Sequence, residues 1–319
     1  MRTTNHFVSN TANLTTSKQL NELVINWHIT ETCNYNCTYC FAKWGKPNEL
    51  NRSLTSIEKL LDELANYFIH GDPEIKRTLD YKDVRLNFAG GEPMMLGRPF
   101  SIALMIAKQK GFKTSIITNG SYLLKRRFAL PKNTLDMIGI SFDSQNYRVR
   151  KELGRIDRKG NSLDIGELKL AIEQLSHTQK GLKTKINTVV NALNWEEDLS
   201  QLISDIKPDK WKVLQVMPSG RNELLITDKQ FNSFVERHSD KGLLISSESN
   251  NTMTESYLMI DPNGRFYQNA KGLSGYIYSE RINDVGVEAA LNQINFNSNR
   301  FMSRYYAENS SNTFGEVQL

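Results

Sequence analysis

The chain has little cysteine and no long hydrophobic run. Only three of its 319 residues are cysteine, too few for a disulfide framework, so the sequence predicts a reducing compartment, the cytoplasm. Residues 1–20 are polar and lack the apolar stretch of a signal peptide. The longest apolar runs, such as Ile102–Ala107, are far shorter than a membrane span. We therefore expect no membrane partner.

Sequence repeats and a strong net charge are also missing. With 39% apolar and 24% charged residues and no Gly-X-Y or heptad period, the composition excludes disordered and fibrous chains. Forty basic and 35 acidic residues give a net charge of +5, which by itself indicates no polyanionic partner. The length permits two domains or a single α/β barrel.

Segments typical of strands and helices alternate from residue 23 onward. A capping box at Thr55-Ser56-Ile57-Glu58 predicts the start of one helix. Six strands joined by helical crossovers are fewer than the eight of a closed barrel, so we predict a partial (βα)6 TIM-like barrel or a doubly wound sheet. We expect a polar segment over residues 1–22, the α/β core over 23–240 and a C-terminal extension over 241–319. The predicted strands are Leu23–Ile29, Val84–Phe88, Thr114–Thr118, Met137–Phe142, Thr184–Val190 and Trp211–Met217.

All three cysteines follow the first predicted strand, at Cys33, Cys37 and Cys40, with the spacing C-x3-C-x2-C. A four-iron cluster normally takes four cysteine ligands, so three would leave one iron open to another molecule. Zinc, with His28 as the nearest candidate for a fourth ligand, and ordinary buried cysteines are the alternatives. The placement of every cysteine within eight positions favours an iron–sulfur site.

This cysteine spacing, with an aromatic residue before the third cysteine, resembles the signature of radical S-adenosylmethionine (SAM) enzymes. Three further strings follow in the order of that superfamily: Gly90-Gly91-Glu92-Pro93, Thr118-Asn119-Gly120 and Ser141-Phe142-Asp143. More specific strings resemble the viperins, a family of radical SAM nucleotide dehydratases, and extend the resemblance from about residue 23 to residue 301. They are Asn26-Trp27-His28, Leu153-Gly154-Arg155, Lys185-Ile186-Asn187-Thr188-Val189, Trp211-Lys212-Val213-Leu214-Gln215, Glu248-Ser249-Asn250, Ser256-Tyr257-Leu258 and Asp284-Val285-Gly286-Val287-Glu288.

The resemblance implies a partial barrel with one 4Fe–4S cluster and SAM as cofactors. The three cysteines would be the cluster ligands, and the Gly90-Gly91-Glu92 string would bind SAM, with the carboxylate of Glu92 accepting from the SAM amino group. Asn119, Ser141 and Arg155 would hold the SAM ribose and carboxylate, because a guanidinium donates to a carboxylate bidentately. Tyr39 would lie against the adenine. The alternative for each is an ordinary turn, loop or packing residue.

Polar residues recur at alternate positions on several predicted strands, where they share a face. The pairs are Asn26 and His28, Arg85 and Asn87, Lys185 and Asn187, and Lys210 and Lys212. Parallel strands are covered on both faces, so a polar face is unfavourable unless it lines a site. Such an interior would attract a polyanion, and without a phosphate-loop motif side chains would hold the phosphates.

The resemblance assigns the same positions to a nucleoside triphosphate. Arg85 stands where viperins often have Lys, and Ala89 stands where animal members have Ser. Tyr305 and Tyr306 are candidates for the tyrosine of the family's C-terminal segment, which covers the substrate. The vertebrate membrane-binding helix is absent, so we expect a prokaryotic-type member. The implied substrate contacts are Asn26, Arg85, Ala89, Lys185, Asn187, Lys210 and Lys212.

The sequence therefore predicts conversion of a nucleoside triphosphate, CTP first and UTP or GTP next, to its 3′-deoxy-3′,4′-didehydro analogue, an antiviral RNA chain terminator. We expect a monomer, an electron donor such as flavodoxin or ferredoxin, and no catalytic residue beyond the cluster and SAM. A radical SAM enzyme acting on a peptide or another metabolite is the main alternative, although no cysteine for an auxiliary cluster follows Cys40. A nucleic-acid-binding iron–sulfur or zinc protein is disfavoured, because the basic residues fall on interior strands.

Overall fold

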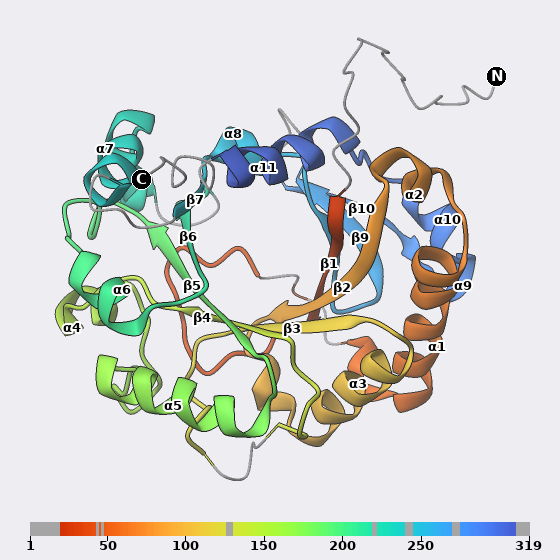
Figure 1. Cartoon of the computed structure of the whole chain (residues 1–319), viewed down its shortest axis with the longest axis horizontal. Helices are drawn as coiled ribbons and strands as arrows, with labels where there is room; N and C mark the ends of the chain where they lie inside the picture. Colours follow the sequence, from red (N-terminus) through yellow and green to blue (C-terminus); the bar gives the residue numbers. More distant parts are fainter. Residues whose placement is uncertain are drawn as a thin grey trace, which may run out of the picture.

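The computed structural model describes residues 20–42, 45, 48–125, 130–218, 222–239, 245–269 and 275–310, without the side chains of 305–310. Its strands form one ten-stranded sheet in the order β10-β9-β8-β1-β2-β3-β4-β5-β6-β7, curved around a central space with helices outside (Figure 1). The strands are β1 Leu20–Thr30, β2 Tyr81–Gly90, β3 Lys113–Thr118, β4 Met137–Ser141, β5 Lys183–Val190, β6 Lys210–Gln215, β7 Ile245–Glu248, β8 Leu258–Ile260, β9 Arg265–Asn269 and β10 Tyr276–Arg281.

The first seven strands are parallel neighbours, and β8 adds to β1 in the same direction. The strands β9 and β10 complete that edge in antiparallel pairing. Because β7 and β10 stand at the two ends of the strand order, the sheet is not closed. The predicted partial barrel is thus confirmed. The sequence interpretation missed β7, a short parallel strand after β6.

Helices cover the outer face of the sheet, and their apolar sides supply much of the core (Figure 1). In α1, Leu60, Leu61 and Leu64 are fully buried. This helix begins at Leu54, and its N-cap is Ser53, whose hydroxyl accepts from the amide of Ser56 at 3.2 Å; the predicted capping box is wrong. The helices are α1 Leu54–Ala65, α2 Glu74–Leu79, α3 Arg98–Gln109, α4 Tyr147–Glu152, α5 Ile165–Thr178, α6 Ser200–Ile206, α7 Asp228–Ser239, α8 Asn250–Met253, α9 Ile282–Val285, α10 Val287–Leu291 and α11 Ser298–Ser310.

Strand register brings polar residues of neighbouring strands together on the inner face. Asn26 pairs with Asn87, and Asn187 pairs with Lys212. The residues between them point outward, and Trp27, Phe88, Ile186 and Trp211 are buried against the helices. Alternation along each strand therefore separates a polar interior from an apolar shell.

The chain after residue 240 contributes to both ends of the sheet. The strand β7 follows β6 at one end, and β8, β9 and β10 follow β1 at the other. The helices α8 and α11 lie between these two ends (Figure 1). In the part of the chain that the structure describes, no helix has the length and hydropathy that crossing a membrane requires.

Candidate active site

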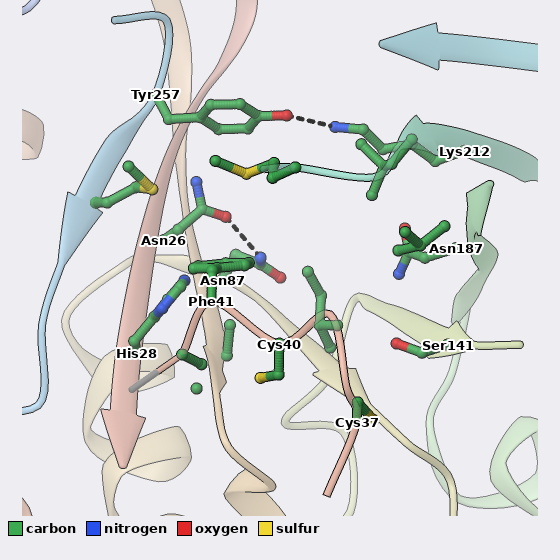
Figure 2. Close-up of a pocket in the computed structure, with 18 of the residues that line it drawn as sticks. Asn26, His28, Cys37, Cys40, Phe41, Asn87, Ser141, Asn187, Lys212 and Tyr257 are labelled. Carbon is green, nitrogen blue, oxygen red and sulfur yellow. Dashed lines mark hydrogen bonds between the residues drawn. The ribbon is translucent and has the colours of Figure 1, made fainter. Parts of the chain in front are cut away.

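The inner face of the sheet encloses a cavity of about 530 Å³, a volume suited to small ligands. All residues predicted to bind a cofactor or substrate line it except Glu92. The lining residues among them are Asn26, Cys33, Cys37, Tyr39, Cys40, Arg85, Ala89, Gly90, Gly91, Asn119, Ser141, Arg155, Lys185, Asn187, Lys210 and Lys212. Cys37 and Cys40 lie at one end, which we call the thiol end, and Lys212 lies toward the opposite end (Figure 2).

The cysteine loop is held by the segment that follows α4. The amide of Asn36 donates to the carbonyl of Gly154 at 3.2 Å, and the amide of Thr38 donates to the carbonyl of Leu153 at 3.0 Å. Gly154 has a φ of +70°, and a Cβ there would lie 2.1 Å from the carbonyl oxygen of Asn36. Only glycine permits this approach without displacing the loop.

N–H donors point at the sulfur atoms. Asn119 Nδ2 lies 3.8 Å from the Sγ of Cys33, and Arg155 Nη1 lies 3.7 Å from the Sγ of Cys37. Burial raises the pKa of Cys33 to about 11, and burial also raises the pKa of Cys37 although Arg155 opposes it. The raised pKa keeps the thiols of Cys33 and Cys37 protonated until a cation stabilises their thiolates, as a bound iron centre does. Three sulfur ligands, two of them with N–H donors nearby, suit an iron–sulfur cluster.

His28, the candidate fourth zinc ligand, is engaged elsewhere. Its Nδ1 lies 2.8 Å from the hydroxyl of Tyr267, and burial lowers its pKa to about 3, so the ring is neutral. Among the described residues, no three His, Cys, Asp or Glu side chains converge on a position for one metal ion. The thiolates of a four-iron cluster bind different irons and need no such common point.

The two glycines at the end of β2 pack closely against the chain itself. A Cβ on Gly90 would lie 2.3 Å from the carbonyl oxygen of Thr30, and one on Gly91 would lie 2.2 Å from that of Thr32. The amide of Gly91 also donates to Thr30 at 2.7 Å. The glycine pair thus brings β2 against the first residues of the cysteine loop, whereas the sequence interpretation expected a close approach to a ligand.

Glu92 is the one predicted cofactor-binding residue that does not line the cavity. Its carboxylate is fully buried and accepts from the hydroxyl of Thr118 at 2.9 Å and from the amides of Asn119 and Met94 at 2.8 and 3.1 Å. Burial raises its pKa to about 7, although these donors oppose the shift. Glu92 thus contacts the backbone amide of Asn119, which lines the cavity, but does not itself line it.

Arg155 joins the cysteine loop to β4. Its Nε lies 3.2 Å from a carboxylate oxygen of Asp143, and its Nη2 donates to the carbonyl of Ser141. The hydroxyl of Tyr39 donates to the same carboxylate. Although burial disfavours the charge, Tyr39, Asp143 and Cys37 raise the pKa of Arg155 well above its ordinary value. Arg155 is therefore a fixed cation beside Cys37.

The other end of the cavity, which we call the cationic end, gathers basic side chains from β2, β5 and β6. Arg85, Lys185, Lys210 and Lys212 all line it. Burial, followed by the charges of Lys212, Arg85 and Lys210, lowers the pKa of Lys185 well below its ordinary value. Like charges held this close repel one another, and a bound polyanion would relieve the repulsion.

Glu248 on β7 is the counter-charge within this group. Its Oε1 lies 2.7 Å from the Nζ of Lys212 and 3.7 Å from Nη1 of Arg304, and Tyr257 donates to its other oxygen. Burial would raise the pKa of Glu248, but Lys212 and Arg304 outweigh burial and lower it to about 2. The Nζ of Lys212 also donates a hydrogen bond to the hydroxyl of Tyr257 at 3.0 Å (Figure 2). At the outer edge, Glu22 lies 2.6 Å from the Nε of Arg85.

Amide side chains line the middle of the cavity. Asn87 donates to Asn26 at 2.7 Å (Figure 2) and accepts from Ser115 at 2.6 Å, so the orientation of Asn26 is set by its neighbours. The Nδ2 of Asn187 is buried and has no hydrogen-bond partner among the described residues. Because Asn187 lines the cavity, this donor is available to a ligand there.

The comparisons with known proteins agree with this geometry. A family model of the radical SAM superfamily matches residues 27–168. A protein of Pseudoalteromonas ulvae named S-adenosylmethionine-dependent nucleotide dehydratase is 46% identical, over 90% of this chain and 94% of that protein. The chain belongs to this nucleotide dehydratase family. A relative of the same name from Psychrobacter lutiphocae is 41% identical, over 89% of this chain and 95% of that protein.

The fold of this nucleotide dehydratase family member is also similar to solved structures of radical SAM enzymes. One is anSMEcpe with bound AdoMet, with a TM-score of 0.61, 15% identity, and coverage of 88% of this chain and 82% of that chain. Another is SuiB of Streptococcus suis bound to S-adenosylmethionine, with a TM-score of 0.52, 16% identity, and coverage of 77% and 60%. At these identities the likeness shows the fold alone.

The sequence interpretation gave no site role to three residues that line the cationic end of this nucleotide dehydratase family member. Glu248 and Tyr257 lie in strings that carry the viperin resemblance, so a signal for them existed. Arg304 lies in α11 and reaches the cavity only through tertiary packing, 3.7 Å above the ring of Tyr257. The side chains of Tyr305 and Tyr306 lie outside the described residues.

Proposed function

We propose that the protein is a radical SAM dehydratase of nucleoside triphosphates, with CTP as the first candidate substrate. The product would be the 3′-deoxy-3′,4′-didehydro analogue, which lacks the hydroxyl that RNA chain growth needs. One observation carries the proposal: a single cavity joins a three-thiol loop at one end to a partly buried group of cations at the other. Membership of the nucleotide dehydratase family supports this reading of the cationic end.

At the thiol end, Cys33, Cys37 and Cys40 would hold a 4Fe–4S cluster with one iron open to SAM. When bound, these groups would supply the electron and the radical chemistry needed to remove the 4′ hydrogen from the ribose. Arg155 would keep a positive charge beside Cys37, and Glu92 would hold Asn119 toward the cavity. The lining positions of Tyr39, Ser141, Gly90 and Gly91 support their assignment to the SAM site.

At the cationic end, the lysines, Arg85 and Arg304 would bind the triphosphate. Asn26 and the unpartnered amide of Asn187 would bind the ribose. The triphosphate would stabilise the protonated form of Lys185, which burial and its cationic neighbours disfavour. Ala89 offers no hydroxyl to the phosphates. Residues 241–319 would cover the substrate, and the protein would act as a monomer supplied by an external electron donor.

The reaction would depend on the position of the substrate and on the exclusion of water more than on acid–base groups of the protein. After hydrogen removal, the 3′ hydroxyl leaves as water, and one electron and one proton complete the product. The protein's part is to hold the ribose between the thiol and cationic ends and to exclude solvent from the radical. We assign no general base, because hydrogen-atom removal requires none.

The test is anaerobic reconstitution with iron and sulfide, followed by incubation with SAM, a strong reductant and CTP, UTP, GTP or ATP separately. Mass spectrometry should find 5′-deoxyadenosine together with a triphosphate that has lost one water. SAM cleavage without a dehydrated nucleotide from any of the four would overturn the dehydratase assignment. Zinc without iron in the purified protein would overturn the radical mechanism as well.

Two variants separate the ends of the cavity in that assay. Cys37→Ala should abolish SAM cleavage. Lys212→Ala should leave the cluster intact and weaken triphosphate binding about tenfold or more, because one buried charge-assisted contact is worth about 1.5–3 kcal/mol. Unchanged nucleotide affinity in Lys212→Ala would remove β6 from the proposed site.

A further inference from the structure

A short segment that includes α4 is rich in basic residues. Residues 146–162 contain six basic and two acidic residues, a net charge of +4 in a chain whose total is +5. Arg148, Lys151, Arg158 and Lys159 are exposed, and we call these four residues the basic surface. The other two basic residues of the segment, Arg150 and Arg155, are buried.

The helix α4 and the turn after it form one rigid unit. The hydroxyl of Tyr147 donates to the carbonyl of Gly160 at 2.9 Å, and the Nε of Arg150 donates to the hydroxyl of Ser162 at 3.0 Å. Tyr147 remains 46% exposed beside Arg148. The basic surface thus has a fixed shape and an aromatic residue at its edge, as many protein-binding surfaces do.

This unit is also in direct contact with the cysteine loop. Leu153 and Gly154 accept hydrogen bonds from loop amides, and Arg155 lies 3.7 Å from the Sγ of Cys37. Asn36, between the first two cysteines, is itself exposed. The segment that carries the basic surface therefore contacts the cysteine loop directly, through Leu153, Gly154 and Arg155.

We propose that the basic surface docks an acidic protein that carries single electrons, such as a flavodoxin. The proposal rests on the cluster assigned under the proposed function. The reduced carrier would lose one electron, the cluster would gain it, and no bond would form or break. Complementary charge would steer the two proteins together, and docking beside Cys37 would keep the transfer distance short.

The test compares two double variants of the reconstituted full chain. In Lys151→Glu with Arg158→Glu, the basic surface is reversed. In the control, Lys59→Glu with Lys82→Glu, two exposed lysines elsewhere are reversed, and α1, which carries Lys59, lies on the opposite side of the molecule from α4 (Figure 1). Each pair lowers the net charge from +5 to +1, so total charge is matched.

Stopped-flow absorbance follows cluster reduction by photoreduced flavodoxin without SAM or nucleotide, and calorimetry measures binding of the oxidised carrier. At low salt we expect flavodoxin to reduce the cluster of the Lys151/Arg158 variant about tenfold more slowly, and this variant to bind the oxidised carrier more weakly. Both differences should shrink at high salt. The control should behave as wild type. Reduction by photoreduced deazaflavin, a small molecule that needs no docking, should be equal in all three proteins.

Equal flavodoxin rates in both double variants would overturn the docking surface while leaving the cluster in place. A cluster that fails to form in wild type would instead contradict the proposed function. If the Lys151/Arg158 variant loses affinity for a short single-stranded RNA but keeps wild-type flavodoxin kinetics, the surface binds nucleic acid and the electron-carrier proposal is wrong.

Discussion

The thiol end of the cavity is shaped by backbone contacts, whereas the cationic end is shaped by charge. Around the cysteines, the carbonyls of Leu153 and Gly154 accept from loop amides, the carbonyl of Thr30 accepts from Gly91, and glycines permit the close approach. At the other end, long side chains of β2, β5 and β6 meet, and Glu248 is their buried counter-charge. Backbone contacts hold the thiol end before any ligand binds. At the cationic end, a bound anion would relieve the repulsion between the basic side chains.

The difference has a physical reason. A cluster must be held by three thiols at fixed positions, so small errors in the loop backbone remove a ligand. A flexible triphosphate can be met by several lysines, each of which can adjust. We therefore expect the thiol end to be sensitive to shape and the cationic end to be sensitive to charge. Four predictions test this contrast, from the largest expected effect to the smallest.

Gly154→Ala should cause the largest loss. The new Cβ would lie 2.1 Å from the carbonyl oxygen of Asn36, so the cysteine loop must move. We expect iron content and SAM cleavage to fall more than tenfold, measured by iron analysis and 5′-deoxyadenosine yield. Gly181→Ala is the matched control, since Gly181 has a similar φ of +67° but no atom within 4 Å of such a Cβ. Equal losses in both would mean that backbone strain alone is responsible.

Glu248→Gln should destabilise the protein, because it removes the buried negative charge that Lys212 and Arg304 share. Breaking a buried ion pair costs about 3–5 kcal/mol, and the retained amide should keep the loss near the lower bound. Urea unfolding measures the loss in free energy of unfolding, and added CTP should stabilise the variant more than it stabilises the wild type. Glu22→Gln, whose side chain is 23% exposed against 2% for Glu248, should cost clearly less. A larger loss in Glu22→Gln would reverse the ranking.

Triphosphate binding should take up a proton at Lys185. In the free protein the pKa of Lys185 lies well below its ordinary value because of burial and neighbouring cations, and a bound anion raises it. Between these two pKa values binding adds a proton, so affinity falls as pH rises through that window. Calorimetry in two buffers of different ionisation enthalpy measures the uptake. Lys185→Arg, which stays charged, should bind the triphosphate without taking up a proton. Equal proton uptake in both proteins would show that another group takes up the proton.

Ala89→Ser should have the smallest effect. The new hydroxyl would add one hydrogen bond to the phosphates, worth about 0.5–1.5 kcal/mol, so CTP affinity should rise about two- to tenfold. Iron content and SAM cleavage without nucleotide should not change. A drop in iron content in Ala89→Ser would show that this position belongs to the thiol end.

The inner face could be predicted because strand alternation is a local property. On each strand, alternate residues face the cavity, and the parallel register places these positions side by side on neighbouring strands. This holds for Asn26, Lys185, Asn187 and Lys212. The cysteine loop could be predicted for the same reason, since its three ligands lie within eight residues. The capping box failed because Ser53, two residues earlier, already caps the helix.

The role of Glu92 and the presence of Arg304 could not be predicted in this way. Glu92 lies in the expected string, yet its carboxylate is fully buried among donors from Thr118, Asn119 and Met94 and does not line the cavity. Arg304 follows a polar stretch with no recognisable pattern. Its place depends on how α11 packs beside β7, a contact between segments far apart in the sequence.

The sequence alone determined the chemistry of the protein: the three thiols, the alternating cations and the family strings are all local patterns. Tertiary structure decided which of these groups share one cavity, which counter-charges they meet, and which surface lies beside the cysteines. The reason is that spacing and alternation are set by backbone geometry within a few residues. Burial, ion pairing and pKa are set by neighbours that folding brings from elsewhere in the chain.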